Sequence, residues 1–305
     1  MEDVVIGIDF GGTTIKFGLV TRTGHIKRQW SIATPAKTAP ETVMAEIVQE
    51  IKRRVSSAEH LLGVGLGIPG SVRPDTLAVY DCNNLGWNKD TDILALLQKG
   101  LDIPLVIEND ANAATIGEKW QDSTSKDNLM YVTLGTGVGA GIVLNDQLVH
   151  GFAGAAGELG HVIVDPKGFK CTCGNRGCLE TVSSATGIVR LYQKESGQDE
   201  VSITAKEIFD QAKQNSPLAL NVVDQACDYL GLALANVANV LNLEEIIIGG
   251  GVAAAGEFLR AKVERSVDKY LYFSAQNHIT IKLASLGNDA GILGMAKLVL
   301  QKVNK

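Results

Sequence analysis

The chain has 305 residues and a net charge of −6, which is enough length for two domains with separate cores. The acidic balance argues against nucleic acid or an anionic membrane as a partner, because no basic stripe appears. No apolar stretch reaches membrane-spanning length, and the initial MEDVVIG lacks the basic and then apolar pattern of a signal peptide. We therefore expect a cytoplasmic enzyme in which Cys82 and Cys227 are reduced, buried thiols.

The first part of the chain predicts an antiparallel meander of three strands, at Val4–Phe10, Lys16–Val20 and Lys27–Ile32. Pro40 then opens a helix whose apolar residues recur every fourth position, at Val43, Ile47, Ile51 and Val55. Further strands are expected at Leu62–Ile68 and Pro104–Ile107, with a helix near Asp92–Gln98 between them. This order of elements indicates an α/β fold with a mixed sheet.

The opening motif recurs in the second half, because DFGGTTIKFGLV at 9–20 and TLGTGVGAGIVL at 133–144 both read as strand, glycine turn and strand. Two copies suggest two similar α/β domains that face each other across a cleft. We place the boundary near Asp110, which gives domains 1–110 and 111–289, and the last helix (290–305) could return to the first domain. The second domain should contain helices at 111–120, 180–194, 205–213, 218–241 and 256–271 and strands at 129–135, 140–144, 245–248 and 279–284.

Each glycine turn presents backbone N–H groups with no Cβ in the way, as a phosphate oxygen requires. The first turn offers amide and hydroxyl donors, a cation and an acceptor for hydrated Mg²⁺; these are Gly11, Gly12, Thr13, Thr14, Lys16 and Asp9. The second offers Gly135, Thr136, Gly137 and Gly139. Either turn alone could be an ordinary hairpin, but two copies favour phosphate binding.

A third glycine run, Gly249, Gly250 and Gly251, ends an apolar strand before a helix. A nucleotide base or ribose could approach the backbone closely there, although a helix-packing turn has the same pattern.

Asp110 in IENDANAA ends a buried strand and precedes a helix, which is where a general base is held partly desolvated. Its neighbours Asn109 and Asn112 could orient a hydroxyl group. The alternative is that Asp110 is only the N-cap of the following helix. The phosphate turns favour the catalytic interpretation.

One imidazole and three thiols fall within eighteen positions, at His161, Cys171, Cys173 and Cys178. Such a set is typical of a closed tetrahedral Zn²⁺ site, which would be structural because all four ligands are protein atoms. Gly174 and Gly177 should adopt positive φ so that the sulfurs converge. A redox pair or buried thiols are the alternatives.

Glu158 precedes His161 by three residues, and Glu180 follows the last thiol by two. Metal binding would draw these polar groups together, which suits a polyhydroxylated ligand. Both could equally be surface carboxylates.

The motifs DFGGTTIKFG, GLGIPGSV, NNLGW, IENDANAA, LGTGVGAGIV, GELGH and CTCGNRGCLETVSSATG together resemble the ROK family of sugar kinases and repressors, in order and along nearly the whole chain. NNLGW and CLETVSSATG resemble its bacterial glucokinase branch. The resemblance implies a two-domain actin-like ATPase fold with ribonuclease H-like mixed sheets, and ATP-dependent phosphorylation of the glucose 6-hydroxyl. It makes Asp110 the base and assigns the sugar to Gly70, Asn84, Asn109, Glu158, His161 and Glu180.

Three other readings stay open. Family repressors carry a helix-turn-helix before the first phosphate strand, and because that strand starts at Val4 here, we expect a kinase. A kinase for fructose or for an N-acetylhexosamine would have the same fold. Use of polyphosphate is disfavoured because few basic residues accompany the motifs. The expected partners are glucose or a related hexose, ATP and a second copy of the chain.

Overall fold

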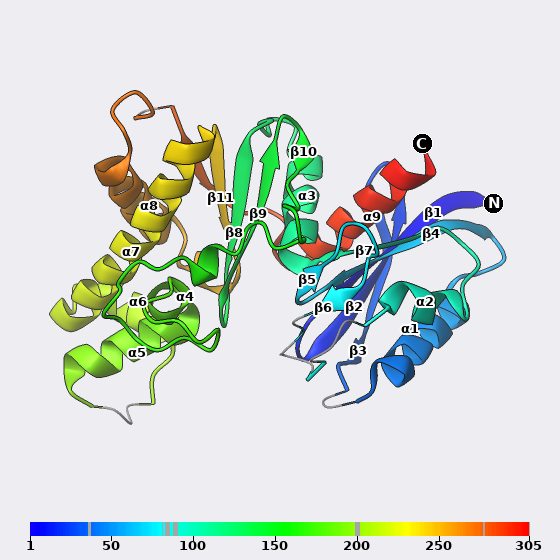
Figure 1. Cartoon of the computed structure of the whole chain (residues 1–305), viewed down its shortest axis with the longest axis horizontal. Helices are drawn as coiled ribbons and strands as arrows, with labels where there is room; N and C mark the ends of the chain where they lie inside the picture. The colour runs from blue at the N-terminus through cyan, green and yellow to red at the C-terminus, as the bar shows by residue number, and fades with distance from the viewer. Residues whose placement is uncertain are drawn as a thin grey trace. The chain divides into compact units, whose positions relative to one another are not determined.

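The computed structural model describes residues 1–35, 38–80, 82, 86–87, 91–198, 202–276 and 278–304. The chain divides into two compact units, each built on a five-stranded sheet (Figure 1). Unit 1 comprises Met1–Ser125, Leu148–Ala156 and Asn288–Lys305, and unit 2 comprises Lys126–Gln147 and Gly157–Gly287. The sequence placed the boundary at Asp110, whereas the contacts group the helix that begins there with unit 1.

The sheet of unit 1 has the order β3-β2-β1-β4-β7, formed by Ile26–Ala33, Thr14–Thr21, Glu2–Phe10, Glu59–Ile68 and Leu105–Asn109. The pairs β1–β2 and β2–β3 are antiparallel, and β1–β4 and β4–β7 are parallel. A short antiparallel pair follows β4, made of β5 (Ser71–Val72) and β6 (Val79–Tyr80). The predicted meander and mixed sheet are confirmed.

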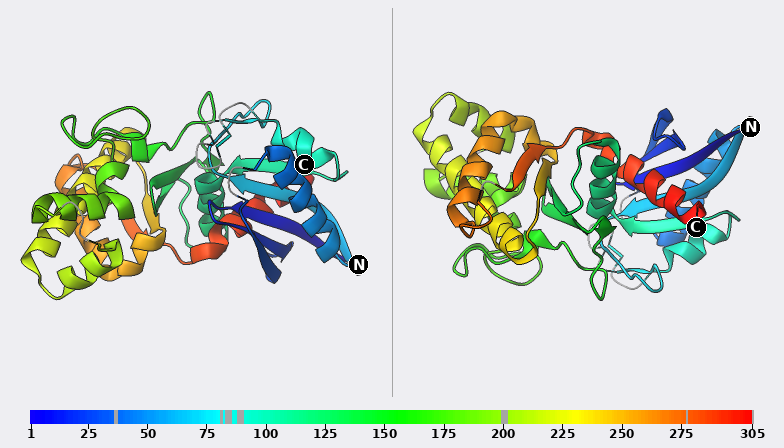
Figure 2. Two further views of the ribbon diagram at one scale, coloured as in Figure 1. Left: turned by 90° about the horizontal axis from the view of Figure 1, so that it is seen from below. Right: turned by 90° about the horizontal axis from the view of Figure 1, so that it is seen from above.

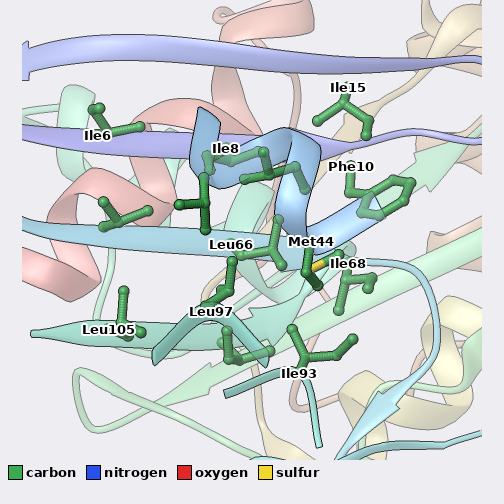
Figure 3. Close-up of a cluster of buried hydrophobic side chains, with 14 of the residues drawn as sticks. Ile6, Ile8, Phe10, Ile15, Met44, Leu66, Ile68, Ile93, Leu97 and Leu105 are labelled. Carbon is green, nitrogen blue, oxygen red and sulfur yellow. The ribbon is translucent and has the colours of Figure 1, made fainter. Parts of the chain in front are cut away.

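The two faces of β1 pack against different helices because successive side chains alternate across the strand. Ile6, Ile8 and Phe10 lie in one buried cluster with Met44 of α1 (Pro40–Arg54) and Ile93 of α2 (Ile93–Gln98), as Figure 3 shows. Gly7 points to the opposite face, towards α9 (Ala290–Val303).

The C-terminal helix α9 packs so closely in unit 1 that the contact points have no room for a Cβ. A Cβ on Gly7 would lie 2.0 Å from the carbonyl oxygen of Ile292. One on Gly117 of α3 (Asp110–Gln121) would lie 2.0 Å from the carbonyl oxygen of Ala290, and one on Gly294 would lie 1.7 Å from that of Ala113. Figures 1 and 2 show α9 against α3 and β1. The last helix of the sequence therefore completes the first unit.

The sheet of unit 2 repeats this arrangement. Its order is β10-β9-β8-β11-β12, formed by Gln147–Leu148, Val138–Leu144, Leu129–Leu134, Glu245–Gly249 and Thr280–Leu283. The pair β8–β9 is antiparallel, and β8–β11 and β11–β12 are parallel, as for β1, β2, β4 and β7. The duplication inferred from the two glycine-turn motifs is confirmed at the level of strand order.

The helices of unit 2 are α4 (Glu180–Ser183), α5 (Ala185–Ser196), α6 (Ala205–Lys213), α7 (Pro217–Leu241) and α8 (Glu257–Tyr270). The single helix predicted over 180–194 is wrong, because the chain is extended at Ser184 (φ −77°, ψ 169°). The Ser184 hydroxyl donates to the carbonyl oxygen of Glu180 and accepts from the amide of Gly187, so it ends one helix and caps the next. Of the helices in the described part of the chain, none has the length and apolar character that crossing a membrane requires.

Candidate active site

The β1–β2 turn is closed by a backbone hydrogen bond and by the side chain of Thr34, the residue that follows β3. The Gly11 amide donates to the Thr14 carbonyl oxygen at 3.0 Å, and the Thr34 hydroxyl donates to the Gly11 carbonyl oxygen at 2.6 Å. The Gly11 amide, which the sequence offered as a phosphate donor, is thus used within the turn, whereas Gly12 and Thr13 are exposed at its tip. The turn can therefore offer N–H and hydroxyl donors to a ligand.

Asp9 and Lys16 lie at the base of the same turn, where Lys16 Nζ is 3.4 Å from Asp9 Oδ2. Burial raises the pKa of Asp9, and the Lys16 ammonium opposes that rise. A further cation beside Asp9 would also favour the ionised carboxylate. The pair thus combines an acceptor for a cation with a positive charge for an anion.

At the junction of β7 and α3, Asn109 caps the helix and Asp110 does not. Asn109 Oδ1 accepts from the amides of Ala111 at 2.9 Å and Asn112 at 3.1 Å. Asp110 is the first residue of α3, and its Oδ1 accepts from the adjacent Ala111 amide at 2.8 Å. The alternative in which Asp110 is the N-cap is wrong, so that role does not account for its carboxylate.

Gly70 and Asn109 are joined directly, because Asn109 Nδ2 donates to the Gly70 carbonyl oxygen at 3.0 Å. Gly70 has φ +106°, which favours glycine, and a Cβ there would lie 2.9 Å from the Tyr80 carbonyl oxygen. Within the described part of the chain, one amide N–H of Asn109 has no partner, because its oxygen and its other N–H are used. Asn84, which the sequence also assigns to the sugar, lies outside the described residues.

The β8–β9 turn is anchored to the start of α5. The Ala185 amide donates to the Gly135 carbonyl oxygen at 2.8 Å, and the Thr186 hydroxyl donates to that of Thr136 at 2.7 Å. Gly139 lies within β9, paired with Thr133. This second turn therefore also directs carbonyl groups into the protein, and the Gly135 amide, a predicted donor, is used within the turn because it donates to the Gly137 carbonyl oxygen at 3.0 Å.

The third glycine run meets the second turn within unit 2. Gly249 ends β11, Gly251 starts a short 3₁₀ helix (Gly251–Ala255), and Gly250 between them has φ +81°. A Cβ on Gly250 would lie 2.5 Å from the amide nitrogen of Leu134, the last residue of β8. The sequence treated these two glycine segments separately, and the sheet brings them together.

For three glycines, the described residues give no steric reason to lack a Cβ. A Cβ on Gly12, Gly135 or Gly251 would meet no described atom within 4 Å, and none of the three has a φ in the left-handed range. Neither packing nor backbone conformation therefore requires them. Each lies in one of the three glycine segments that the sequence predicted to bind a ligand.

His161, Cys171, Cys173 and Cys178 converge as predicted, with their ligand atoms all within 4.8 Å of one another. The sulfurs of Cys173 and Cys178 are 3.6 Å apart, which is far from a disulfide bond, and Cys171 Sγ is 3.7 Å from His161 Nδ1. The convergence depends on Gly177, which has φ +75° and whose Cβ would lie 1.5 Å from the Asp165 carbonyl oxygen. These four groups form a candidate site for a four-coordinate metal ion.

The pKa values of Cys173 and Cys178 are shifted in opposite directions. Burial raises the pKa of Cys178 to about 12, whereas the backbone amide of Asn175 lowers that of Cys173. A metal that binds thiolates here must displace protons, so its affinity should fall at acid pH.

Glu180 and Glu158 lie on different sides of this cluster. Glu180 Oε1 is 3.2 Å from Cys171 Sγ, and its Oε2 lies where a Cβ on Gly137 would be only 2.8 Å away. Glu180 therefore contacts both the metal loop and the β8–β9 turn and is not a surface carboxylate. Glu158 Oε2 is 3.9 Å from His161 Nε2, so the ring presents Nδ1 to the thiols and Nε2 to Glu158.

Sequence reasoning missed Thr34, Glu108 and His150. Thr34 closes the first turn, and Glu108, two residues before Asp110, bonds His150 at 2.7 Å. No spacing rule links Glu108 to a histidine 42 residues away. The remaining candidate residues fall into two sets: those from Asp9 to Asp110 belong to unit 1, and those from Gly135 to Gly251 belong to unit 2.

A family profile described as "ROK family" matches residues 5–302. The chain belongs to the ROK family. It is 39% identical to a glucokinase of Halalkalibacterium halodurans, over 98% of this chain and 96% of that protein. It is 36% identical to a glucokinase of Thermotoga maritima, over 98% of each. Among solved structures, a ROK family glucokinase from Streptomyces griseus in complex with glucose and AMPPNP has a TM-score of 0.82 at 31% identity and covers 98% of this chain and 99% of that one. The present chain therefore has the mixed α/β, actin-like ATPase fold of ROK sugar kinases.

Proposed function

We propose that this protein is an ATP-dependent glucokinase, which transfers the γ-phosphoryl group to the 6-hydroxyl of D-glucose and yields glucose 6-phosphate. The observation that carries the proposal is the near full-length similarity to two proteins named glucokinase and to a glucokinase solved with glucose and AMPPNP. Phosphoryl transfer needs mainly positioning and neutralised charge, and the glycine turns and carboxylates described above are suited to both.

The nucleotide is assigned to the three glycine segments and their neighbours. Gly12, Gly135 and Gly251 would let phosphate or ribose reach the backbone, and Thr13, Thr14 and Thr136 would add hydroxyl donors. Lys16 supplies a positive charge. Asp9 would hold hydrated Mg²⁺, which neutralises charge on the triphosphate when bound.

Gly135→Ala tests this assignment, because the new Cβ meets no described atom in the folded protein. We expect an unchanged melting temperature and a rise of about tenfold or more in KM for ATP, since a methyl group would occupy space that the phosphate needs. Gly250→Ala is the contrast: its Cβ collides with Leu134, so that variant should lose stability. A Gly135→Ala enzyme with normal KM for ATP would contradict the assignment.

Asp110 is assigned as the general base that accepts the proton of the 6-hydroxyl as its oxygen attacks the γ-phosphate. Its carboxylate stands in the first turn of α3, while Asn109 already caps that helix. Asp110 is therefore not the N-cap, although its Oδ1 accepts from the Ala111 amide.

Asp110→Asn should lower kcat by roughly 10²–10⁴, the usual contribution of a positioned acid or base. Asparagine keeps the shape and can still bond the sugar, so glucose affinity measured by calorimetric titration should change far less. Because the cap is Asn109, urea unfolding should show little loss of stability. Near-normal turnover would return Asp110 to a structural role.

The sugar is assigned to Gly70, Asn84, Asn109, Asp110, Glu158, His161 and Glu180. His161 Nε2 faces Glu158 and is available to a hydroxyl, whereas Nδ1 faces the metal cluster. Glu180 and Glu158 would accept hydrogen bonds from the sugar, and the remaining N–H of Asn109 would donate one. Asp110 would both bind the sugar and accept the proton of its 6-hydroxyl group.

A hexose panel tests the substrate. Glucose should have the highest kcat/KM against mannose, fructose, N-acetylglucosamine and N-acetylmannosamine, because polar groups assigned to its hydroxyls would be left unpaired by other sugars. The product should be the 6-phosphate, identified by NMR. A higher kcat/KM for an N-acetylhexosamine would overturn the choice of glucose and leave the kinase class in place.

The metal is assigned as structural Zn²⁺ held by His161, Cys171, Cys173 and Cys178. Tetrahedral Zn²⁺ with bonds of about 2.3 Å to sulfur and 2.0–2.1 Å to nitrogen places two sulfurs about 3.8 Å apart and sulfur and nitrogen about 3.6 Å apart. The separations of 3.6 and 3.7 Å in this cluster fit those values. The ion would fix the loop that carries His161 and Glu180.

Protein purified without chelators should contain about one zinc per chain. Cys173→Ser should lose the metal and raise KM for glucose, because the loop loses its closure. Cys227→Ala removes a buried thiol of α7 that is not part of the cluster, and it should retain zinc. Elemental analysis that finds no zinc in the unchanged protein would refute the site.

Cytoplasmic location and assembly as a homodimer complete the proposal. Thiols stay reduced in the cytoplasm, which fits the free cysteines of the described chain.

A further inference from the structure

The segment Leu148–Ala156, here called the strap, is docked on unit 1 although the chain before and after it belongs to unit 2. The Tyr80 hydroxyl donates to the carbonyl oxygen of Ala153. Gly154 has φ +77° and passes so close to Val72 that a Cβ would lie 1.9 Å from its carbonyl oxygen. These two contacts hold the strap to the β5–β6 pair.

A third anchor holds the strap to β7. His150 Nε2 lies 2.7 Å from Glu108 Oε2, and the ring is about half-buried. The Ala156 amide donates to the carbonyl oxygen of His150 at 3.1 Å, which closes the strap into a loop. His150 is therefore the strap residue that is tied to the strand leading to Asp110.

Glu108 is buried with only 6% of its surface exposed, and three donors surround its carboxylate. Oε1 accepts from the Asn109 amide at 2.9 Å and from Asn112 Nδ2 at 3.0 Å, and Oε2 faces His150. Asn112 Nδ2 donates to Glu108, whereas Asn112 Oδ1 is buried and has no hydrogen-bond partner among the described residues. The arrangement supplies the hydrogen bonds and the partner for a charge that a buried carboxylate needs.

We propose that His150 is a positioning residue for glucose phosphorylation, which acts through its ion pair with Glu108 to fix the strap ahead of the sugar ligands Glu158 and His161. The inference rests on the proposed function. The chain reaches Glu158 two residues after the strap ends, so a loosened strap releases the preceding end of the sugar-binding segment. Loss of His150 should therefore weaken sugar binding more than it slows the chemical step.

The ion pair also predicts a pH dependence. The hydrogen bond and the charge of Glu108 raise the pKa of His150 above its usual 6.5. Below that raised pKa the imidazolium pairs with Glu108, and the anchor weakens as the pH rises through it. The strap also contacts Tyr80, through Ala153, and the guanidinium of Arg73 lies 4.7 Å from the Tyr80 ring centre. KM for glucose should thus rise on the alkaline side.

Steady-state kinetics of His150→Gln and His150→Arg across pH test the proposal. His150→Gln should raise KM for glucose about three- to tenfold at neutral pH, with kcat within about twofold, because the hydrogen bond to Glu108 loses the positive charge of its donor. His150→Arg keeps a cation at every pH, so it should restore a low KM and remove its alkaline rise. His60→Gln breaks a similar pair with Asp3, at 2.9 Å on an exposed surface, and should leave KM unchanged.

NMR titration of His150 supplies a readout that needs no turnover. Its pKa should lie above 6.5 in the unchanged protein and fall in Glu108→Gln. A His150→Gln enzyme with the normal KM and pH profile, or a His150 that titrates at or below 6.5, overturns the proposal. Equal losses in His150→Gln and His150→Arg also overturn it, because they indicate a purely structural side chain. If the unchanged protein phosphorylates no hexose, the proposed function fails, while the titration still reports the ion pair.

Discussion

The arrangement of unit 1 depends on the close packing of α9 against α3 and the sheet. At Gly7, Gly117 and Gly294 the backbones approach to a distance that any side chain would prevent. Because interiors do not deform freely, such contacts allow one placement of the helices and not a range. The strand that carries Asp9 and the helix that carries Asp110 are both held by this contact. Even Gly291 belongs to it, since a Cβ there would lie 3.1 Å from Asp9 Cγ.

The sequence predicted most elements because their hydrophobic periods are clear, as in α1, where Val43, Ile47 and Ile51 are buried. It did not predict the break at Ser184, because serine is tolerated within helices and its capping bonds are visible only in the folded chain. The partner of the last helix was also left open. A periodic pattern shows which face of a helix is apolar and does not show which sheet covers it.

The sequence likewise predicted some parts of the candidate site and not others. Ligand spacing predicted the cysteine and histidine cluster, since four such residues within eighteen positions have few other uses. The sequence offered only Asp110 as a possible cap of α3 and did not identify Asn109, although both residue types cap helices well. The hydrogen bonds show that Asn109 is the cap. The pair of Glu108 and His150 could not be found at all, because only the fold brings the two segments together.

The glycines show why identifying a binding site requires the structure as well as the sequence motif. Gly177 is required by its positive φ and by Asp165, and Gly117 is required by the close approach of α9. In the sequence these residues are indistinguishable from Gly12, Gly135 and Gly251, yet the folded protein gives the latter no internal reason to lack a side chain. A glycine that neither backbone conformation nor packing explains therefore points to something outside the chain. Three such residues, each in a separate glycine segment, are a stronger indication of a bound ligand than the motifs that contain them.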